Sequence, residues 1–202
     1  MADLPSTLVQ PSRPFLNTGV DYAGPVSLRI RTSRRKTIIE GYIAIFVCFA
    51  TKANHIEVVT SLITEAFIAA LRRFIARRGI PGTIHSNNGT NFQGTTNELR
   101  TIYKMLQSIW QLATIKDFLA AEECECSFIP PHAPPLGELW EAAVKSIKFH
   151  MRRTLGSHVS IYEELCTLLS EIETCLNSRP LFALSDDLSN RIYLSPRHFL
   201  IG

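Results

Sequence analysis

The hydrophobic pattern of the chain changes its period shortly after residue 60, and this change limits the folds that the chain can adopt. Three segments of strand character come before it, and they cover residues 18–31, 37–50 and 55–60. After it, apolar side chains recur at helical spacing from Phe67 to Ile75, with Thr64 as the expected N-cap and Gly79 as a stop signal. Short strands in direct succession favour an antiparallel meander. We therefore expect an antiparallel sheet that continues into alternating helices and strands.

The rest of the chain alternates between predicted helices and short predicted strands. The expected strands cover residues 83–85 and 126–129. The expected helices cover residues 95–121 (in two pieces divided near Ser108), 139–155 and 161–178. Ser160 and Glu163 form a predicted capping box at the start of the last helix. The order βββ-α-β-α-β-α-α predicts an α/β fold, with a mixed sheet and helices on its faces.

The composition is that of one globular domain with a substantial core. Of the 202 residues, 46% are hydrophobic and 19% are charged. The longest apolar run, from Tyr42 to Ala50, is too short for a membrane span, and the N-terminal residues lack the pattern of a secretory signal. A net charge of +3 permits a nucleic-acid partner without requiring one. The five cysteines are scattered, and we expect reduced thiols; Cys124 and Cys126 alone are a weak metal-binding pattern.

Three polar positions stand where predicted strands end or a predicted helix begins: Asp21, Asn87 and Glu141. Asp21 lies inside an otherwise apolar strand, where a carboxylate is costly to bury unless it is paired or bound to a metal. Taken singly, each has an ordinary structural interpretation, as a strand-edge Asp, a turn Asn and a first-turn helix Glu that suits the dipole. Periodicity alone leaves both interpretations open, a shared metal site and three unrelated structural residues.

Local sequence motifs favour the shared site. Residues 87–92 (NNGTNF) resemble the D-N-G-T-N-F segment of integrases, with Asn87 in place of the second acid. Residues 130–134 (PPHAP) and 137–146 (GELWEAAVKS) resemble the loop and catalytic helix of integrases from Pao/BEL-type LTR retrotransposons. Further matching segments are PSRPF at 11–15, TGVDYAGP at 18–25, FATKA at 49–53, CLNSRPL at 175–181 and SPRHFLIG at 195–202. The resemblance covers nearly the whole chain, in the same order.

This resemblance implies a ribonuclease H-like fold with a five-stranded mixed sheet flanked by helices. It also implies that Asp21, Asn87 and Glu141 are the catalytic and metal-binding residues, holding two Mg²⁺ (or Mn²⁺) ions for cleavage and strand transfer of phosphodiesters. The neutral oxygen of Asn87 is a weaker ligand for a hard dication than the carboxylate it replaces, so metal binding and activity should be impaired. Glu138 lies nearly one turn before Glu141 on the predicted helix and is expected to face solvent, so it does not substitute for the missing acid.

The resemblance further implies contact with DNA, namely the ends of the retroelement and the target DNA. Lys145, Lys148 and Arg152 follow Glu141 at +4, +7 and +11, on one face of the predicted helix, and are the expected DNA-binding residues; a solvated basic face is the alternative. The family also implies a homodimer through the core. The arginines of the first helix, Arg72, Arg73, Arg77 and Arg78, are then expected at the interface rim or in solvent. No membrane association is expected, and the predicted location is nuclear or cytoplasmic, not secreted.

The expected domain organisation has three parts. Residues 1–15 are expected as an extended N-terminal arm, 16–182 as the integrase catalytic core and 183–202 as a C-terminal extension truncated before a DNA-binding domain. Two functions of different classes remain. The first is an integrase core whose activity is impaired by Asn87. The alternative is a non-catalytic module, derived from a degenerate or domesticated integrase, that binds nucleic acid or dimerises.

Overall fold

A computed structural model of the chain describes residues 11–32, 35–86, 113–128, 134–156, 158–184 and 193–201. Within these ranges, the backbone alone is described for residues 31–32, 35–36, 126–128, 134–141 and 201. The whole motif NNGTNF at 87–92, which includes Asn87, and the loop around His132 therefore lie outside the described residues.

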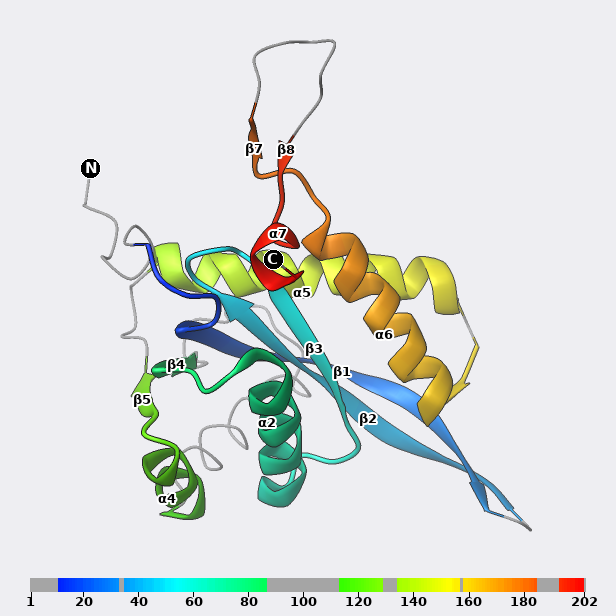
Figure 1. Ribbon diagram of the computed structural model, residues 1–202. Coiled ribbons are helices and arrows are strands. Elements are labelled where there is room, and N and C mark those ends of the chain that lie inside the picture. Colours follow the sequence, from blue (N-terminus) through cyan, green and yellow to red (C-terminus); the bar gives the residue numbers. More distant parts are fainter. Residues whose placement is uncertain are drawn as a thin grey trace.

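A mixed sheet forms the centre of the molecule, with the strand order β3-β2-β1-β4-β5 (Figure 1). Its strands are β1 (Asn17–Thr32), β2 (Arg35–Cys48), β3 (Asn54–Val59), β4 (Thr83–Ser86) and β5 (Glu125–Phe128). The first three strands pair antiparallel, and β4 and β5 continue the sheet parallel to β1. The two-residue strand β6 (Ser160–Ile161) adds a short parallel pairing to β1 at Leu28 and Arg29. The five-stranded mixed sheet that the sequence predicts is confirmed.

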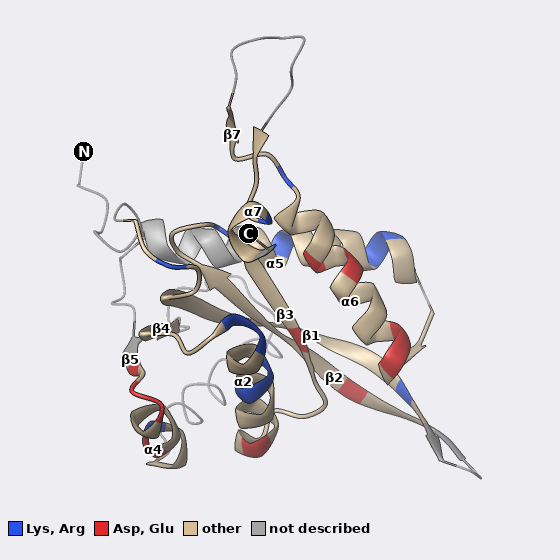
Figure 2. Ribbon diagram, in the orientation of Figure 1, with Lys and Arg blue, Asp and Glu red and all other residues tan. Residues whose placement is uncertain are grey.

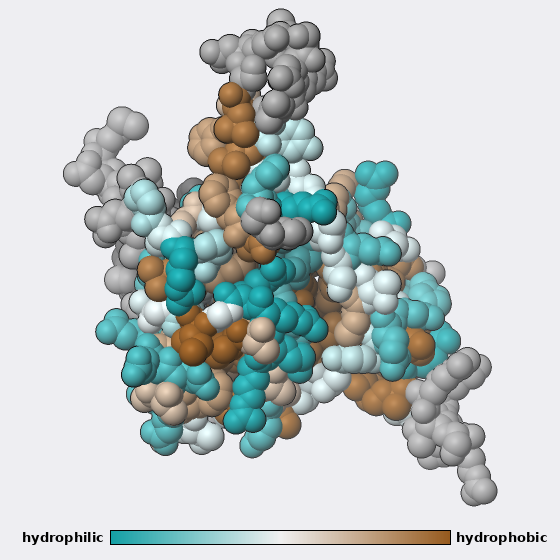
Figure 3. Space-filling view, in the orientation of Figure 1, coloured by the Kyte–Doolittle hydropathy of each residue, from teal (hydrophilic) through white to brown (hydrophobic). Residues whose placement is uncertain are grey.

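Helices cover both faces of this sheet. The helices α2 (Thr64–Arg78) and α4 (Ala113–Ala121) lie on one face, and α5 (Pro134–Leu155) and α6 (Tyr162–Asn177) lie on the other (Figure 1). A small hairpin of β7 (Phe182–Ala183) and β8 (Tyr193–Leu194) follows α6, and α7 (His198–Ile201) ends the described chain. On the face shown in Figure 3, a band of hydrophilic residues covers α2.

Each face of the sheet has its own apolar core. The core under α2 and α4 centres on Phe74, whose ring stacks on Phe46 at 4.3 Å between centroids and meets Phe15 edge-on at 5.3 Å. The core under α5 and α6 includes Ala143 and Ile147, which lie one helical turn apart. Burying one such apolar side chain contributes about 1.5–3 kcal/mol, so these two layers hold the helices against the sheet.

The strand β1 contributes alternate side chains to the two cores. Val20 and Tyr22 pack in the core of α2 and α4, whereas Ala23 packs in the core of α5 and α6. Successive side chains of a strand point to opposite faces, and Asp21 therefore faces the α5–α6 layer. The position of this carboxylate follows directly from the register of the hydrophobic pattern.

Two helix starts differ from their predictions. The N-cap of α2 is Ile63 and not Thr64, which is instead the first helical residue. At α6, the capping carboxylate is Glu164 and not Glu163; its Oε2 accepts a hydrogen bond from the backbone N–H of Ile161 at 3.1 Å. The shift by one residue arises because Ser160 is buried in the sheet, where it pairs with β1, so the helix cannot begin there.

Candidate metal centre and nucleic-acid interface

Asp21 is a buried carboxylate on the central strand of the sheet. Its residue is 4% exposed, and its Oδ1 accepts a hydrogen bond from the backbone N–H of Tyr22 at 2.8 Å. Its neighbour across the sheet is Ile45 of β2, an apolar residue with no exposed surface. A charged group in such a setting needs polar or ionic partners, because its desolvation costs several kcal/mol. Asp21 is thus suited to be a metal ligand.

The carboxyl end of β4 lies beside Asp21. Ser86, the last residue of β4, pairs with Val20, and His85 pairs with Gly19. Among the described residues, His85 Nε2 and Ser86 Oγ are buried polar atoms without a hydrogen-bond partner. Asn87 follows Ser86 in the sequence but lies outside the described residues. Ile84 packs in the core of α2 and α4, so the alternation of side chains puts Ser86 on that face and His85 on the face of Asp21. The described part of β4 therefore ends beside Val20, one residue before Asp21.

His85 is a feature of this region that the sequence suggested only as a strand-end residue. Its ring stacks on Phe49, with 4.8 Å between centroids and 22° between planes. Burial lowers the pKa of His85, so its imidazole is neutral at physiological pH. Nε2 of this neutral ring is buried without a hydrogen-bond partner, on the face of the sheet that Asp21 also faces. A bound ligand could form a hydrogen bond with it. The burial of His85 depends on Phe49, which is distant in sequence. The local sequence pattern therefore could not predict it.

The position of Glu141 lies on α5, which packs across the same face of the sheet. Its backbone is helical, and its side chain lies outside the described atoms. Further along the helix, Ala143 and Ile147 pack in the same core as Ala23 of β1. The structure thus places α5 on the side of the sheet that Asp21 faces. The meeting of Asp21, Asn87 and Glu141 in one site stays a prediction, since only Asp21 has a described side chain.

The chemistry of the described donors fits a hard divalent cation in part. Carboxylate oxygens are the preferred ligands of Mg²⁺, and Asp21 supplies one such group in a buried position. Within the described part of the chain, no group of three or more His, Cys, Asp or Glu side chains is placed to hold a metal ion. The side chains of the other two expected ligands, Asn87 and Glu141, fall outside that part, so the fit rests on Asp21.

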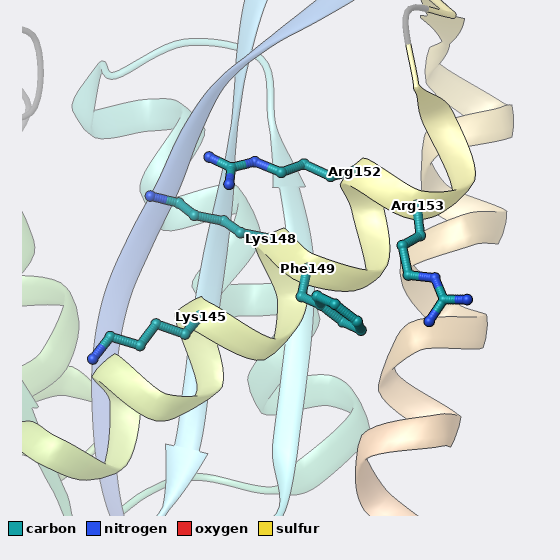
Figure 4. A pocket seen from close by; sticks show the side chains of 5 residues that line it. All are labelled: Lys145, Lys148, Phe149, Arg152 and Arg153. Carbon is teal, nitrogen blue, oxygen red and sulfur yellow. The ribbon is translucent and has the colours of Figure 1, made fainter.

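Lys145, Lys148 and Arg152 form a continuous basic stripe along α5, which we call the α5 stripe. Lys145 and Arg152 are exposed and Lys148 is half-buried. Figure 4 shows their three side chains extending to the same side of the helix. Lys148 and Arg152 also line a hollow of about 240 Å³ against β1, formed on the strand side by Ala23–Val26. This segment begins two residues after Asp21, so the stripe and the buried carboxylate share one region of the surface.

The arginines of α2 have partners within the chain. Arg73 Nε and Arg77 Nη1 lie 2.6 and 2.8 Å from the carboxylate oxygens of Glu57 on β3. Arg78 pairs with Glu173 of α6, and the guanidinium of Arg72 lies 5.3 Å from the centroid of the Phe118 ring. Figure 2 shows the basic residues at the C-terminal end of α2. The prediction that these arginines are rim or solvent residues is incomplete, because two carboxylates from other elements pair with three of them.

His55 completes this charged cluster between β3, α2 and α6. Its Nε2 lies 3.0 Å from Glu57 Oε1, and its Nδ1 lies 3.4 Å from Glu173 Oε2. Burial opposes the charge on the ring, but the hydrogen bonds to Glu173 and Glu57 outweigh burial and raise the pKa of His55. The cluster is therefore a structural ion network that ties α2 and α6 to the edge strand β3.

Solved structures with the same fold are retroviral proteins. The HTLV-2 integrase catalytic core domain, solved in complex with magnesium in a trimeric form, matches with a TM-score of 0.56 and 12% identity, over 95% of this chain and 99% of that one. A chain of the simian T-cell lymphotropic virus intasome, solved with the PP2A regulatory subunit B56 gamma, matches with a TM-score of 0.55 and 12% identity, over 94% of this chain. This chain spans 55% of the length of that intasome chain. No protein-family model and no curated protein matches the sequence.

The chain therefore has the ribonuclease H-like fold of retroviral integrase catalytic cores. A likeness at 12% identity establishes the fold, and any activity has to be argued from the residues of this chain. Among the described helices, none combines the length and apolar character that crossing a membrane requires.

Proposed function

We propose that this chain is the catalytic core of a Pao/BEL-type retrotransposon integrase, a polynucleotidyl transferase that binds DNA and whose metal-dependent chemistry is impaired. The observation that carries the proposal is the position of the buried carboxylate of Asp21, which faces the same helical layer that bears the α5 stripe. A buried acid beside a line of cations is the arrangement that phosphodiester chemistry requires. The cations attract the DNA backbone, and the acid holds the metal at the scissile phosphate.

Asp21, Asn87 and Glu141 are the proposed metal-binding and catalytic residues. When Mg²⁺ or Mn²⁺ is bound, it supplies Lewis-acid activation of the attacking oxygen and stabilises the charge on the leaving oxygen. The burial of Asp21 among apolar residues excludes water around its carboxylate and strengthens its attraction for a cation. Lys145, Lys148 and Arg152 hold the phosphates of the DNA strand along α5 and so set its position relative to Asp21.

Asn87 is the reason for proposing impaired chemistry. Replacing a carboxylate by a neutral amide removes one charge at about 4 Å from the metal, which forfeits on the order of 4 kcal/mol at an effective dielectric constant of about 20. This difference corresponds to roughly a thousandfold in affinity at the position that residue 87 completes. Binding of DNA does not depend on this charge and should persist.

The proposed partners are DNA, as retroelement ends and target, and a second copy of the chain through the core. The family resemblance places the dimer contact on the first and last core helices, here α2 and α6. The proposed location is the nucleus or the cytoplasm, without secretion. The proposed organisation is an arm over 1–15, the core over 16–182 and an extension over 183–202.

A second candidate function is a non-catalytic module that binds DNA or dimerises. Asn87 favours it, because the sequence keeps the basic α5 stripe and the surrounding motifs while the second acid is lost. The two candidates make the same prediction for DNA binding and different predictions for strand cleavage and joining.

A disintegration assay separates these candidates. The substrate is a branched DNA that mimics an integration product. The proteins are the wild type, Asn87→Asp, Glu141→Gln and the double variant Asn87→Asp/Glu141→Gln. We expect little or no product from the wild type with Mg²⁺ and a clear gain in Asn87→Asp. We also expect that gain to be abolished in the double variant with Glu141→Gln. A wild type as active as Asn87→Asp would contradict the impairment, and an Asn87→Asp protein that binds DNA without any product would favour the non-catalytic module.

A further inference from the structure

Phe149 is an exposed aromatic residue in the middle of the basic surface of α5. Its residue is 54% exposed, whereas Ile147 on the same helix is completely buried. Lys145 and Arg153 lie four residues on either side of it and Arg152 lies three residues after it, so all three are its neighbours on the helix surface. A large apolar ring left in water on such a helix has no packing role in the core, and its position calls for another explanation.

The ring and the cations line one common hollow. Lys145, Lys148, Phe149, Arg152 and Arg153 surround a space of about 320 Å³. The guanidinium of Arg153 lies 5.5 Å from the centroid of the Phe149 ring, within the range of a cation–π contact. Figure 4 shows Phe149 between Arg153, which extends to one side of α5, and the α5 stripe, which extends to the other. The hollow is thus lined by four cations and one aromatic ring.

This combination matches the chemistry of an unpaired nucleotide. Proteins that bind single strands use cations for the phosphates and aromatic side chains for the bases, because every base has a face on which a ring can stack. Inside a duplex both faces of each base are already stacked on neighbours. A phenyl ring can therefore take part only at a strand end or at an unpaired base.

We propose that Phe149 stacks on an unpaired base of a DNA strand whose phosphates contact Lys145, Lys148 and Arg152. The preferred ligand is then a DNA end with a single-stranded overhang. This inference rests on the proposed function, since it requires DNA to lie along α5, and it adds a residue that selects the structure of the bound end. The four cations make a nucleic-acid strand a better match for this hollow than an apolar protein surface.

Fluorescence anisotropy with three DNA probes tests the proposal on the full chain. The probes are a blunt duplex, the same duplex with a short single-stranded overhang, and the same duplex with an overhang of abasic nucleotides. The abasic overhang keeps every phosphate and removes the bases, so it separates stacking from charge. The variants are Phe149→Ala, which removes the ring, and Phe149→Trp, which keeps an aromatic face. Phe182→Ala is the matched control, because Phe182 is 69% exposed on β7.

We expect the wild type to prefer the base-bearing overhang over the abasic one by about fivefold or more, the lower end of what stacking of one base provides. Phe149→Ala should lose this preference, with a much smaller change in binding of the blunt duplex, which offers the ring only its terminal base pairs. Phe149→Trp and Phe182→Ala should keep it. A fluorescent base analogue in the overhang should be quenched by the wild type and by Phe149→Trp, and not by Phe149→Ala.

Three results would overturn the proposal in different ways. If the wild type binds all three probes equally, or if Phe149→Ala weakens them all equally, DNA lies along α5 but Phe149 does not stack on a base. If the wild type binds none of the probes, the proposed function fails together with this inference. A change in oligomeric state in Phe149→Ala with unchanged preference for the overhang would also reject the stacking role, in favour of a protein contact.

Discussion

Removing two charges from the α5 stripe should change the salt dependence of DNA binding by a predictable amount. The perturbation is the double variant Lys145→Ala/Arg152→Ala, chosen because both side chains are exposed and neither is part of a described ion pair. Each phosphate contact contributes about 0.9 to the slope of log K against log salt concentration for duplex DNA. Loss of two contacts should therefore lower the magnitude of the slope by about 1.8.

The same relation gives the expected loss of affinity. If the variant and the wild type bind DNA equally at about 1 M salt, a slope smaller by about 1.8 means that the variant binds more weakly at lower salt. The loss of affinity is then roughly 60-fold at 0.1 M and roughly 18-fold at 0.2 M. The loss should be nearly independent of the DNA sequence, because phosphate contacts carry no sequence information. Anisotropy titrations of a labelled duplex at four or five salt concentrations would measure both quantities.

The matched control is Lys116→Ala/Arg197→Ala. Both residues are exposed, on α4 and before α7, and the double change also lowers the net charge from +3 to +1. If the control lowers the slope as much as the α5 variant does, DNA is attracted by net charge alone. The assignment of the α5 stripe as the DNA-contacting surface would then be wrong.

Three further predictions concern the metal, the ion network and the core. Asn87→Asp should raise the affinity for Mg²⁺ by roughly a thousandfold at the position it completes, measured by calorimetric titration; equal affinities would show that residue 87 is not a ligand. The carboxylates of Glu57 and Glu173 raise the pKa of His55 above 6.5, so its contribution to stability is present below that pH and is lost as the pH rises through the raised value. Urea unfolding should show this decline, and His55→Asn should not. Phe74→Ala should lower the free energy of unfolding by about 3–5 kcal/mol, and a loss below about 1 kcal/mol would contradict the observed stacking.

The ion network has a consequence for the proposed dimer. Glu57 is 6% exposed at its side chain, and it already binds Arg73, Arg77 and His55. Two carboxylates, Glu57 and Glu173, thus serve three arginines of α2, so a partner that covers this face would still meet positive charge, chiefly at the exposed Arg77. Arg73 and Arg77 are 36% and 61% exposed at their side chains, so solvent screens both pairs and each contributes at most about 1 kcal/mol. Within the single chain, the two pairs serve chiefly to keep the buried carboxylate of Glu57 from being left without a partner.

The sequence by itself determined the elements that depend on local pattern. The change in hydrophobic period predicted the first three strands and α2 to within a few residues, because side-chain periodicity is a property of neighbours along the chain. The carboxylate of Asp21 was identifiable in the same way, as a charge in an otherwise apolar strand. The basic stripe on α5 followed from helical spacing alone, and the structure places Lys145 and Arg152 on an exposed face as expected.

The tertiary structure decided which of these features lie together. Several contacts join residues that are distant in sequence, and no local period encodes such contacts. Examples are the pairing of Ser86 with Val20, the stacking of His85 on Phe49 and the contact of α2 with Glu173. The shift of the α6 cap arose for the same reason, because pairing of Ser160 in the sheet overrides a local capping preference. Local patterns therefore define the strands, helices and charged faces. The packing of one element against another decides which charges are paired, which ring stays exposed and on which face of the sheet the buried acid lies.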